Sequence, residues 1–205
     1  MISVNVLAVR YLSSVPETMR KALGTEDACL GLITTDSDDP TYIALDQATK
    51  DAQVSVCYGR SFYAGAGNST TPNAGEVLGI LAGPTPGAVR SGMESALREL
   101  QRVGFEDISG VPCLAHTVSR CGSFLAKEAG VPEGTPLAYL IAPPLESMYA
   151  LDAALKAADV ALCKLYKPPT ETNFGGGLLT GSQSACAAAC NAFRDAVAEI
   201  ARHPK

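Results

Sequence analysis

The 205-residue chain contains no tryptophan and only two histidines, His116 and His203. A histidine-based catalytic triad would have to use one of these two, and His203 lies in the C-terminal tail, where we expect it to be exposed. No GxxxxGK[ST] phosphate-binding loop is present. The glycine runs at 65–67 and 175–177 precede predicted strands instead of opening helices, which argues against a dinucleotide site. We therefore predict no enzymatic activity and no cofactor.

Positive charge is also scarce. Sixteen Lys and Arg residues face 21 Asp and Glu residues, and no basic stripe with interleaved aromatic residues appears, so nucleic acid is not an expected partner. No apolar run reaches the roughly 20 residues that a membrane helix needs. The first residues, MISVNVLAVRYL, are typical of a strand and not of a signal peptide. We expect a cytoplasmic protein whose seven cysteines are reduced.

One possible metal motif is the spacing of Cys113, His116 and Cys121. No fourth ligand follows at a recognisable distance. A partly buried histidine on a strand, beside two structural thiols, is the interpretation we favour, and we predict no metal site.

Two segments of the chain resemble each other, YIALDQATKDAQV at 42–54 and YALDAALKAADV at 149–160. Asp46 aligns with Asp152, 106 positions further on. Each segment predicts a helix with a small apolar face and, on the other side, an i,i+4 Asp–Lys pair, Asp46–Lys50 or Asp152–Lys156. Chance similarity between alanine-rich helices is the alternative to duplication.

The order of predicted elements favours duplication. A strand, a helix, a strand, a long loop, a strand and a helix follow one another between residues 28 and 104, and again between 136 and 203. Each half of about 100 residues predicts a compact α/β unit of the α+β sandwich type, with helices packed on a mixed sheet.

Acidic side chains gather before the first repeated helix, in the run Asp36–Asp39, and Glu76 follows the first long loop. The acidic run could bind a divalent cation, but its position before Pro40 favours helix capping. A spare carboxylate near a second one would suit a small ammonium-bearing ligand. Spacing alone does not bring Asp38 to Glu76.

The two long loops, RSFYAGAGNSTTPNAG from Arg60 and KPPTETNFGGG from Lys167, hold equivalent places in the two halves. Each carries aromatic residues among glycines: Phe62 and Tyr63 in the first, Phe174 in the second. A surface excursion without function is one interpretation. A lid or pore closure is the other, with glycine giving pliancy and an aromatic ring closing the opening.

Several stretches closely resemble the EutL family, the tandem-domain shell proteins of ethanolamine-utilisation bacterial microcompartments. They include GLITTDSDDPTYIALDQATKDAQV, YGRSFYAGAG, GEVLGILAGPTP, PPTETNF and LTGSQSACAAACNAFRDAVAEIARHP. The resemblance covers nearly the whole chain, from about Ser3 to Pro204, and is weakest at the N-terminus and around 101–112.

The resemblance implies two circularly permuted, ferredoxin-like microcompartment (BMC) domains, residues 1–104 and 105–205. Three chains would form a pseudohexameric tile in the microcompartment shell, alongside other shell proteins, with a gated central pore. Smaller pores would bind ethanolamine or a similar amine through Asp38, Glu76 and Phe105. The residues implied at the central opening are Arg60, Phe62, Tyr63, Gly65, Gly67, Asn68, Thr172, Asn173, Phe174, Gly175 and Gly176.

Two other functions remain open at this point. A tandem ferredoxin-like sensor that binds a small amine would use the same acids without forming layers. An enzyme would use Asp38 and Glu76 as acid and base, although no sequence feature requires one.

Overall fold

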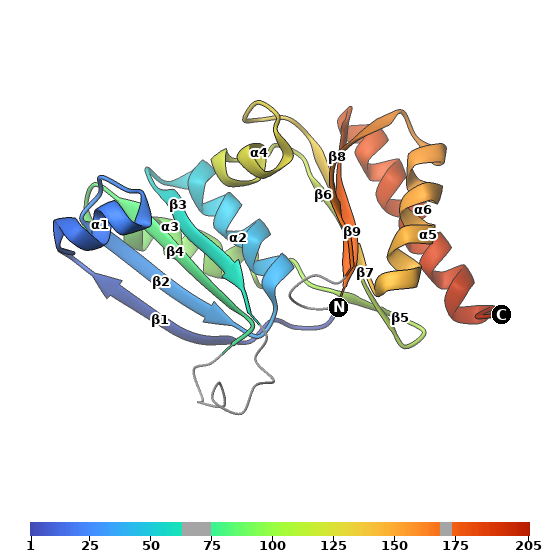
Figure 1. Ribbon diagram of the computed structural model, residues 1–205, viewed down its shortest axis with the longest axis horizontal. Coiled ribbons are helices and arrows are strands. Elements are labelled where there is room, and N and C mark those ends of the chain that lie inside the picture. Colours follow the sequence, from blue (N-terminus) through green and yellow to red (C-terminus); the bar gives the residue numbers. More distant parts are fainter. Residues whose placement is uncertain (63–74, 169–173) are drawn as a thin grey trace. The chain divides into compact units, whose positions relative to one another are not determined.

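The computed structural model describes residues 1–62, 75–168 and 174–205, which form two compact units (Figure 1). The N-terminal unit holds Ser3–Val103 together with Gly122–Leu125. The C-terminal unit holds Met1–Ile2, Gly104–Cys121 and Ala126–Lys205. Within the described residues, no helix has the length and apolar composition that crossing a membrane requires.

The N-terminal unit is a four-stranded antiparallel sheet in the order β1-β2-β4-β3. Helices α2 and α3 pack on one face of it, and α1 lies beside the apolar cluster on the other face. Its elements are β1 (Val6–Leu12), α1 (Glu17–Leu23), β2 (Cys29–Thr35), α2 (Asp38–Asp51), β3 (Ser55–Ser61), β4 (Val77–Gly83) and α3 (Pro86–Glu99).

The C-terminal unit repeats this plan with one added strand, in the order β5-β6-β7-β9-β8. Helices α5 and α6 cover one face of its sheet (Figure 1). Its elements are β5 (Glu106–Ile108), β6 (Val111–Val118), α4 (Ser123–Ala129, whose first residues belong to the other unit), β7 (Leu137–Ala142), α5 (Pro144–Ala157), β8 (Val160–Tyr166), β9 (Gly175–Gly181) and α6 (Gln183–Arg202).

The two sheets share a detail beyond strand order. The register of β3 shifts between Val56 and Tyr58, and that of β8 shifts between Leu162 and Lys164, each 106 positions later. The prediction of a mixed sheet is wrong, because every pairing among the described strands is antiparallel. The two strands that flank each repeated helix do not pair, since β4 lies between β2 and β3 and β9 lies between β7 and β8.

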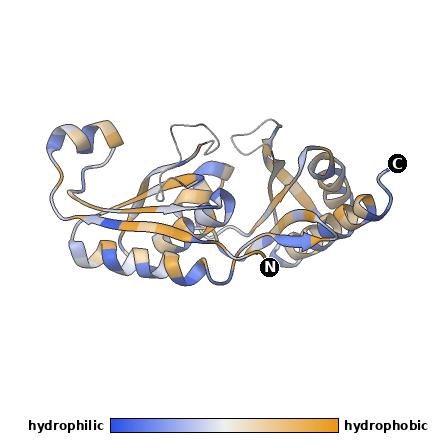
Figure 2. Cartoon of the chain, turned by 90° about the horizontal axis from the view of Figure 1, so that it is seen from below, coloured by the Kyte–Doolittle hydropathy of each residue, from blue (hydrophilic) through white to orange (hydrophobic). Residues whose placement is uncertain are grey.

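A hydroxyl side chain caps the N-terminus of the last helix in each unit, α3 and α6. The Oγ1 of Thr85 accepts a hydrogen bond from the Ala88 backbone N–H at 3.1 Å, and Pro86 occupies the first turn of α3. Ser182 repeats this at α6, where its Oγ accepts from the Ala185 N–H at 3.1 Å. Hydrophilic and hydrophobic stretches alternate along the helices (Figure 2), as expected of helices that lie with one face on a sheet.

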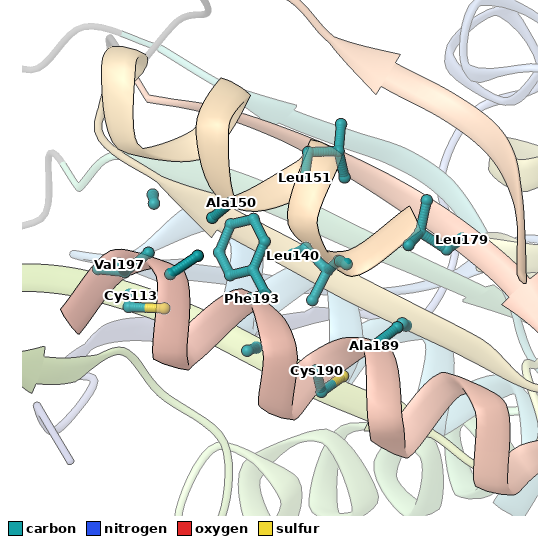
Figure 3. Packing of buried hydrophobic residues seen from close by; sticks show 14 of the residues in the cluster. Cys113, Leu140, Ala150, Leu151, Leu179, Ala189, Cys190, Phe193 and Val197 are labelled. Carbon is teal, nitrogen blue, oxygen red and sulfur yellow. The ribbon is translucent and has the colours of Figure 1, made fainter. Parts of the chain in front are cut away.

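Small side chains let helices and sheet approach closely in the C-terminal core (Figure 3). The ring of Phe193 on α6 lies near Ala150 of α5 and Leu140 of β7, and all three are fully buried. Cys190 fills space in the same cluster as a small apolar residue. The sheet and the two helices therefore share one continuous core.

The two repeated aspartates differ in their surroundings. Asp152 and Lys156 form the predicted i,i+4 ion pair at the surface, with 2.6 Å between Oδ2 and Nζ. The predicted pair of the first half also forms, with Lys50 Nζ 3.6 Å from Asp46 Oδ2, but here the Asp46 side chain is fully buried. Its carboxylate accepts hydrogen bonds from backbone at Gly122 and Leu125.

Candidate functional site

The acidic residues noted in the sequence meet at one end of the N-terminal sheet. Strand β2 ends at Thr35, and α2 begins at Asp38 after a two-residue connection. Thr35 pairs with Val77, the first residue of β4, so Glu76 stands beside the end of β2. The antiparallel ladder thus brings the acids of the β2–α2 connection to Glu76, which spacing in the sequence could not do.

The backbone of Glu76 is fixed on both sides. Its N–H donates to the Thr35 carbonyl at 2.8 Å, and its carbonyl accepts from the Phe62 N–H at 2.9 Å. Just before it, Gly75 is buried so close to Thr35 that an added Cβ would overlap the Thr35 carbonyl oxygen. Only glycine leaves room for this approach, so Gly75 helps to place the Glu76 side chain.

Asp38 occupies the first turn of α2, where the helix dipole favours negative charge. Its Oδ1 accepts the Asp39 N–H at 2.8 Å, and its side chain is largely buried. The side chain of the N-cap residue, Ser37, makes no capping hydrogen bond. Instead the Ser37 carbonyl accepts from the hydroxyls of Thr35 and Thr41, at 2.8 and 2.7 Å, which holds the turn before the helix.

Asp36 is held by Asn5, across the β1–β2 pairing. The Asn5 backbone N–H donates to Asp36 Oδ1 at 2.8 Å, and its side-chain amide donates to Oδ2 at 2.6 Å. The Asp36 N–H returns a bond to the Asn5 carbonyl at 3.2 Å. Asp36 is therefore a fixed negative charge beside the other two acids.

The pKa of the Glu76 carboxyl reflects the burial and negative charge of the cluster. Burial raises its pKa most, and the neighbouring charges of Asp38 and then Asp36 raise it further. The residue keeps an exposed surface, so its carboxyl is accessible to solutes. A cation that entered the site would be attracted by the same field that disfavours ionisation of Glu76.

The chemistry of the cluster fits a small ammonium better than a metal. Among residues 1–62, 75–168 and 174–205, no group of three or more His, Cys, Asp or Glu side chains has the arrangement of a metal site. Carboxylate oxygens are also the natural acceptors of charge-assisted hydrogen bonds from an ammonium group.

Phe105, the third predicted ligand residue, belongs to the C-terminal unit. Its ring is buried and packs against Phe174, with 5.6 Å between centroids and 53° between planes. Its carbonyl accepts the Ile2 N–H at 2.6 Å. The structure thus brings Asp38 and Glu76 together in one unit, while Phe105 is part of the other.

The predicted opening residues fall at the ends of hairpin strands. Arg60 and Phe62 are exposed at and just after the end of β3, while Gly175 and Gly176 are buried at the start of β9. Phe174 is described as well. The remaining predicted residues of these loops lie outside the described residues: Tyr63, Gly65, Gly67, Asn68, Thr172 and Asn173.

Cys113, His116 and Cys121 do not converge on a common point among the described residues. Cys113 belongs to the apolar core of the C-terminal unit, and burial raises the pKa of its thiol to about 12. The thiol of Cys121 lies 3.6 Å from the Pro132 carbonyl oxygen. Both cysteines fill buried space.

Two residues that help to position the acids, Asn5 and Gly75, were not predicted from the sequence. Asn5 gives no local sign that it will clamp Asp36, 31 residues away, and Gly75 resembles any other glycine of a long loop. Both act through the β1–β2 and β2–β4 registers, which only the folded sheet defines.

Comparison with known proteins adds the identity that geometry alone cannot give. The family model of the BMC domain matches residues 29–110. The bacterial microcompartment shell protein EutL of Clostridium perfringens is 59% identical over 207 aligned positions, covering 98% of this chain and 95% of that protein. This chain belongs to the EutL family of bacterial microcompartment shell proteins.

Solved structures agree with EutL-family membership. The ethanolamine utilization protein EutL from Leptotrichia buccalis superposes with a TM-score of 0.95 at 56% identity, covering 99% of this chain and 96% of that one. A trimeric bacterial microcompartment shell protein, PduB, superposes with a TM-score of 0.77 at 19% identity, covering 94% and 87%. At that identity the second match shows the fold alone.

Membership of the EutL family confirms the resemblance and the tandem BMC fold predicted from the sequence. It also makes this chain a structural shell protein and not an enzyme, so the acid–base role considered for Asp38 and Glu76 is excluded. Its place is the shell of a microcompartment.

Proposed function

We propose that this EutL-family protein forms homotrimers, each a pseudohexameric tile of the shell that packs beside other shell proteins. The two units support this, since they repeat the same strand order and the same register shift 106 residues apart. Two similar halves per chain, here taken as residues 1–104 and 105–205, give six quasi-equivalent positions when three chains close into a ring.

The central opening of the tile would be shaped by the two long loops. Each loop joins antiparallel neighbours, β3 to β4 in one unit and β8 to β9 in the other, so the loops hold equivalent places on the repeated fold. Three chains would present both sets around a single axis. Passage of metabolites or larger cofactors through a loop-gated pore is the transport role we propose.

The acidic pair Asp38 and Glu76 is proposed to bind ethanolamine or a similar small amine. Phe105, which belongs to the other unit, stays a prediction from the family resemblance. The observation that carries this proposal is the convergence of two carboxylates at one sheet end, with Asp36 adding a third negative charge. An ammonium group satisfies such a cluster through charge and hydrogen bonds together. The family name points to the same ligand class.

The assembly is tested by native mass and electron microscopy of the purified full chain. We expect a species of about three times the 21.2 kDa chain mass, which packs into layers with a regular array of openings. A discrete trimer that never forms layers would favour an amine sensor. A monomer at all concentrations would contradict the proposal.

Ethanolamine binding is expected to weaken as the pH falls from neutral through the raised pKa of Glu76. Because the pKa of Glu76 is raised, its carboxylate is neutralised at a higher pH than an ordinary glutamate, which titrates near about 4.3. The alkylammonium group of the ligand stays charged throughout this range. Calorimetric titration at a series of pH values measures the effect.

Glu76→Gln is the control, since it should flatten this pH dependence. The stability of the free protein should respond in the opposite direction. A raised carboxyl pKa means that ionised Glu76 costs stability, and this cost is relieved as the pH falls through the raised pKa. Equal pH dependence in the wild type and the variant would contradict the role of Glu76.

A further inference from the structure

Four residues of the chain, Gly122–Leu125, pack with the N-terminal unit although the segments on both sides of them belong to the C-terminal unit. They include the beginning of α4 (Ser123–Ala129). The first N–H groups of a helix have no partner within the helix itself. What satisfies them here shows how the segment is held.

The acceptors come from the side of α2. Asp46 Oδ2 accepts the Gly122 N–H at 2.7 Å, and Oδ1 accepts the Leu125 N–H at 2.8 Å. Thr49 Oγ1, one turn further along α2, accepts the Ser123 N–H at 3.1 Å. Two side chains of α2 therefore bind three N–H groups of the segment.

The Asp46 carboxylate is fully buried, and the Nζ of Lys50 lies 3.6 Å from its Oδ2. Burial raises the pKa of Asp46, whereas the N–H groups of Gly122 and Leu125 and the charge of Lys50 lower it. A buried acceptor of this kind is costly unless its hydrogen bonds are made. The carboxylate and the segment thus depend on each other.

Apolar contacts complete the fit. Leu125 is 1% exposed, and the ring of Phe124 lies 6.0 Å from that of Tyr42 on α2. Phe124 also covers Gly59 of β3, where an added Cβ would come within 3.2 Å of the ring. An added Cβ at Gly122 would overlap the Thr49 hydroxyl, so the segment and α2 touch without spare room.

The other half of the chain uses the equivalent aspartate differently. Asp152 sits at the same place in the repeated sequence, yet its side chain is 61% exposed and pairs with Lys156, itself 74% exposed. Exposed pairs of this kind contribute little to stability. The same residue type at the repeated position thus forms a surface pair in one unit and binds a chain segment in the other.

We propose that Asp46 and Thr49 form a latch that holds Gly122–Leu125 on α2, and that this latch opens as a local unit while the N-terminal sheet stays folded. Only four residues are docked, by three hydrogen bonds and two apolar side chains, so their release exposes little of the core. At the other end of α4, Glu128 lies 3.3 Å from Lys164 and accepts from the Tyr166 hydroxyl at 3.2 Å. That end keeps its own contacts when the latch opens.

Amide hydrogen exchange of the full-length protein tests the latch. In Asp46→Asn, exchange at the amides of Gly122, Ser123 and Leu125 should rise by about 10- to 100-fold, because a charged acceptor of two hydrogen bonds is lost. Amides of β2, such as those of Leu30 and Ile33, should keep the wild-type rate. Asp152→Asn is the matched control and should leave all these amides unchanged.

Unchanged exchange at the three amides, or an equal rise throughout β2, would overturn the proposal. If Asp46→Asn does not fold, Thr49→Ala decides, since it removes the acceptor of a single N–H. Exchange at Ser123 should then rise by about 3- to 10-fold with β2 unaffected. No rise at Ser123, or a rise shared with β2, would again overturn it.

Discussion

Replacement of Asp38 by asparagine is expected to weaken ethanolamine binding by about 10- to 100-fold, because the ligand ammonium loses a charged acceptor. Asp38 lies in the first turn of α2, largely buried and with its Oδ1 already accepting the Asp39 N–H. The carboxylate therefore has a fixed position, and the isosteric amide keeps its shape while removing its charge. Calorimetric titration of both proteins with ethanolamine measures the loss.

The matched control is Asp152→Asn, the equivalent change in the other half, which should leave the dissociation constant unchanged. Glu76→Gln should also weaken binding, but it should leave the free protein equally stable or slightly more so, since it relieves repulsion from Asp38 and Asp36. Equal affinities for the wild type and Asp38→Asn would rule out the proposed site. Equal losses for Asp38→Asn and Asp152→Asn would show a general charge effect.

Replacement of Gly176 by alanine is expected to destabilise the protein by about 3 to 5 kcal/mol. Gly176 is buried at the start of β9 with a φ of +148°, a conformation that alanine rarely adopts. An added Cβ would also overlap the carbonyl oxygen of Leu140 on the neighbouring strand β7. Strain and overlap thus act together where β9 begins between β7 and β8, and the midpoint of thermal unfolding should fall by about 10 °C or more.

Gly87→Ala provides the control. Gly87 lies in the first turn of α3, and an added Cβ would meet only the Thr85 hydroxyl, 3.9 Å away. In a helix this change should be neutral or stabilise the protein by about 0.5 to 1 kcal/mol. A Gly176→Ala variant that unfolds at the wild-type temperature would show that neither strain nor overlap acts at this position.

Much of the fold could be predicted from the spacing of apolar residues and from the glycines and prolines that end helices and strands. The repeated helix follows from its small apolar face: Leu45 and Ala48 in one half, and Leu151 and Ala154 in the other, are all buried. The predicted mixed sheet was wrong because a strand–helix–strand order does not show whether another strand lies between the two strands in the sheet. That β4 separates β2 from β3 depends on contacts distant in the sequence.

The candidate site was predictable only as a set of residue types. The sequence singled out Asp38 and Glu76 as acids near helix and strand ends, but their meeting depends on the pairing of Thr35 with Val77. The clamp from Asn5 on Asp36 depends in the same way on the β1–β2 register. Hydrogen bonds between neighbouring strands join residues that are distant in the sequence, and the sequence around one residue does not identify its partner on the other strand.

By itself, the sequence determined the repeated order of elements, the helices with their apolar faces, the two glycine-rich loops and the resemblance to the EutL family. These properties depend on residues near one another in the chain, where spacing is enough. Only the tertiary structure decided that Asp46 is buried against Gly122 and Leu125, whereas Asp152 lies at the surface with Lys156. The physical reason is that the burial of a side chain depends on what packs around it, and similar local sequences can be packed against different neighbours.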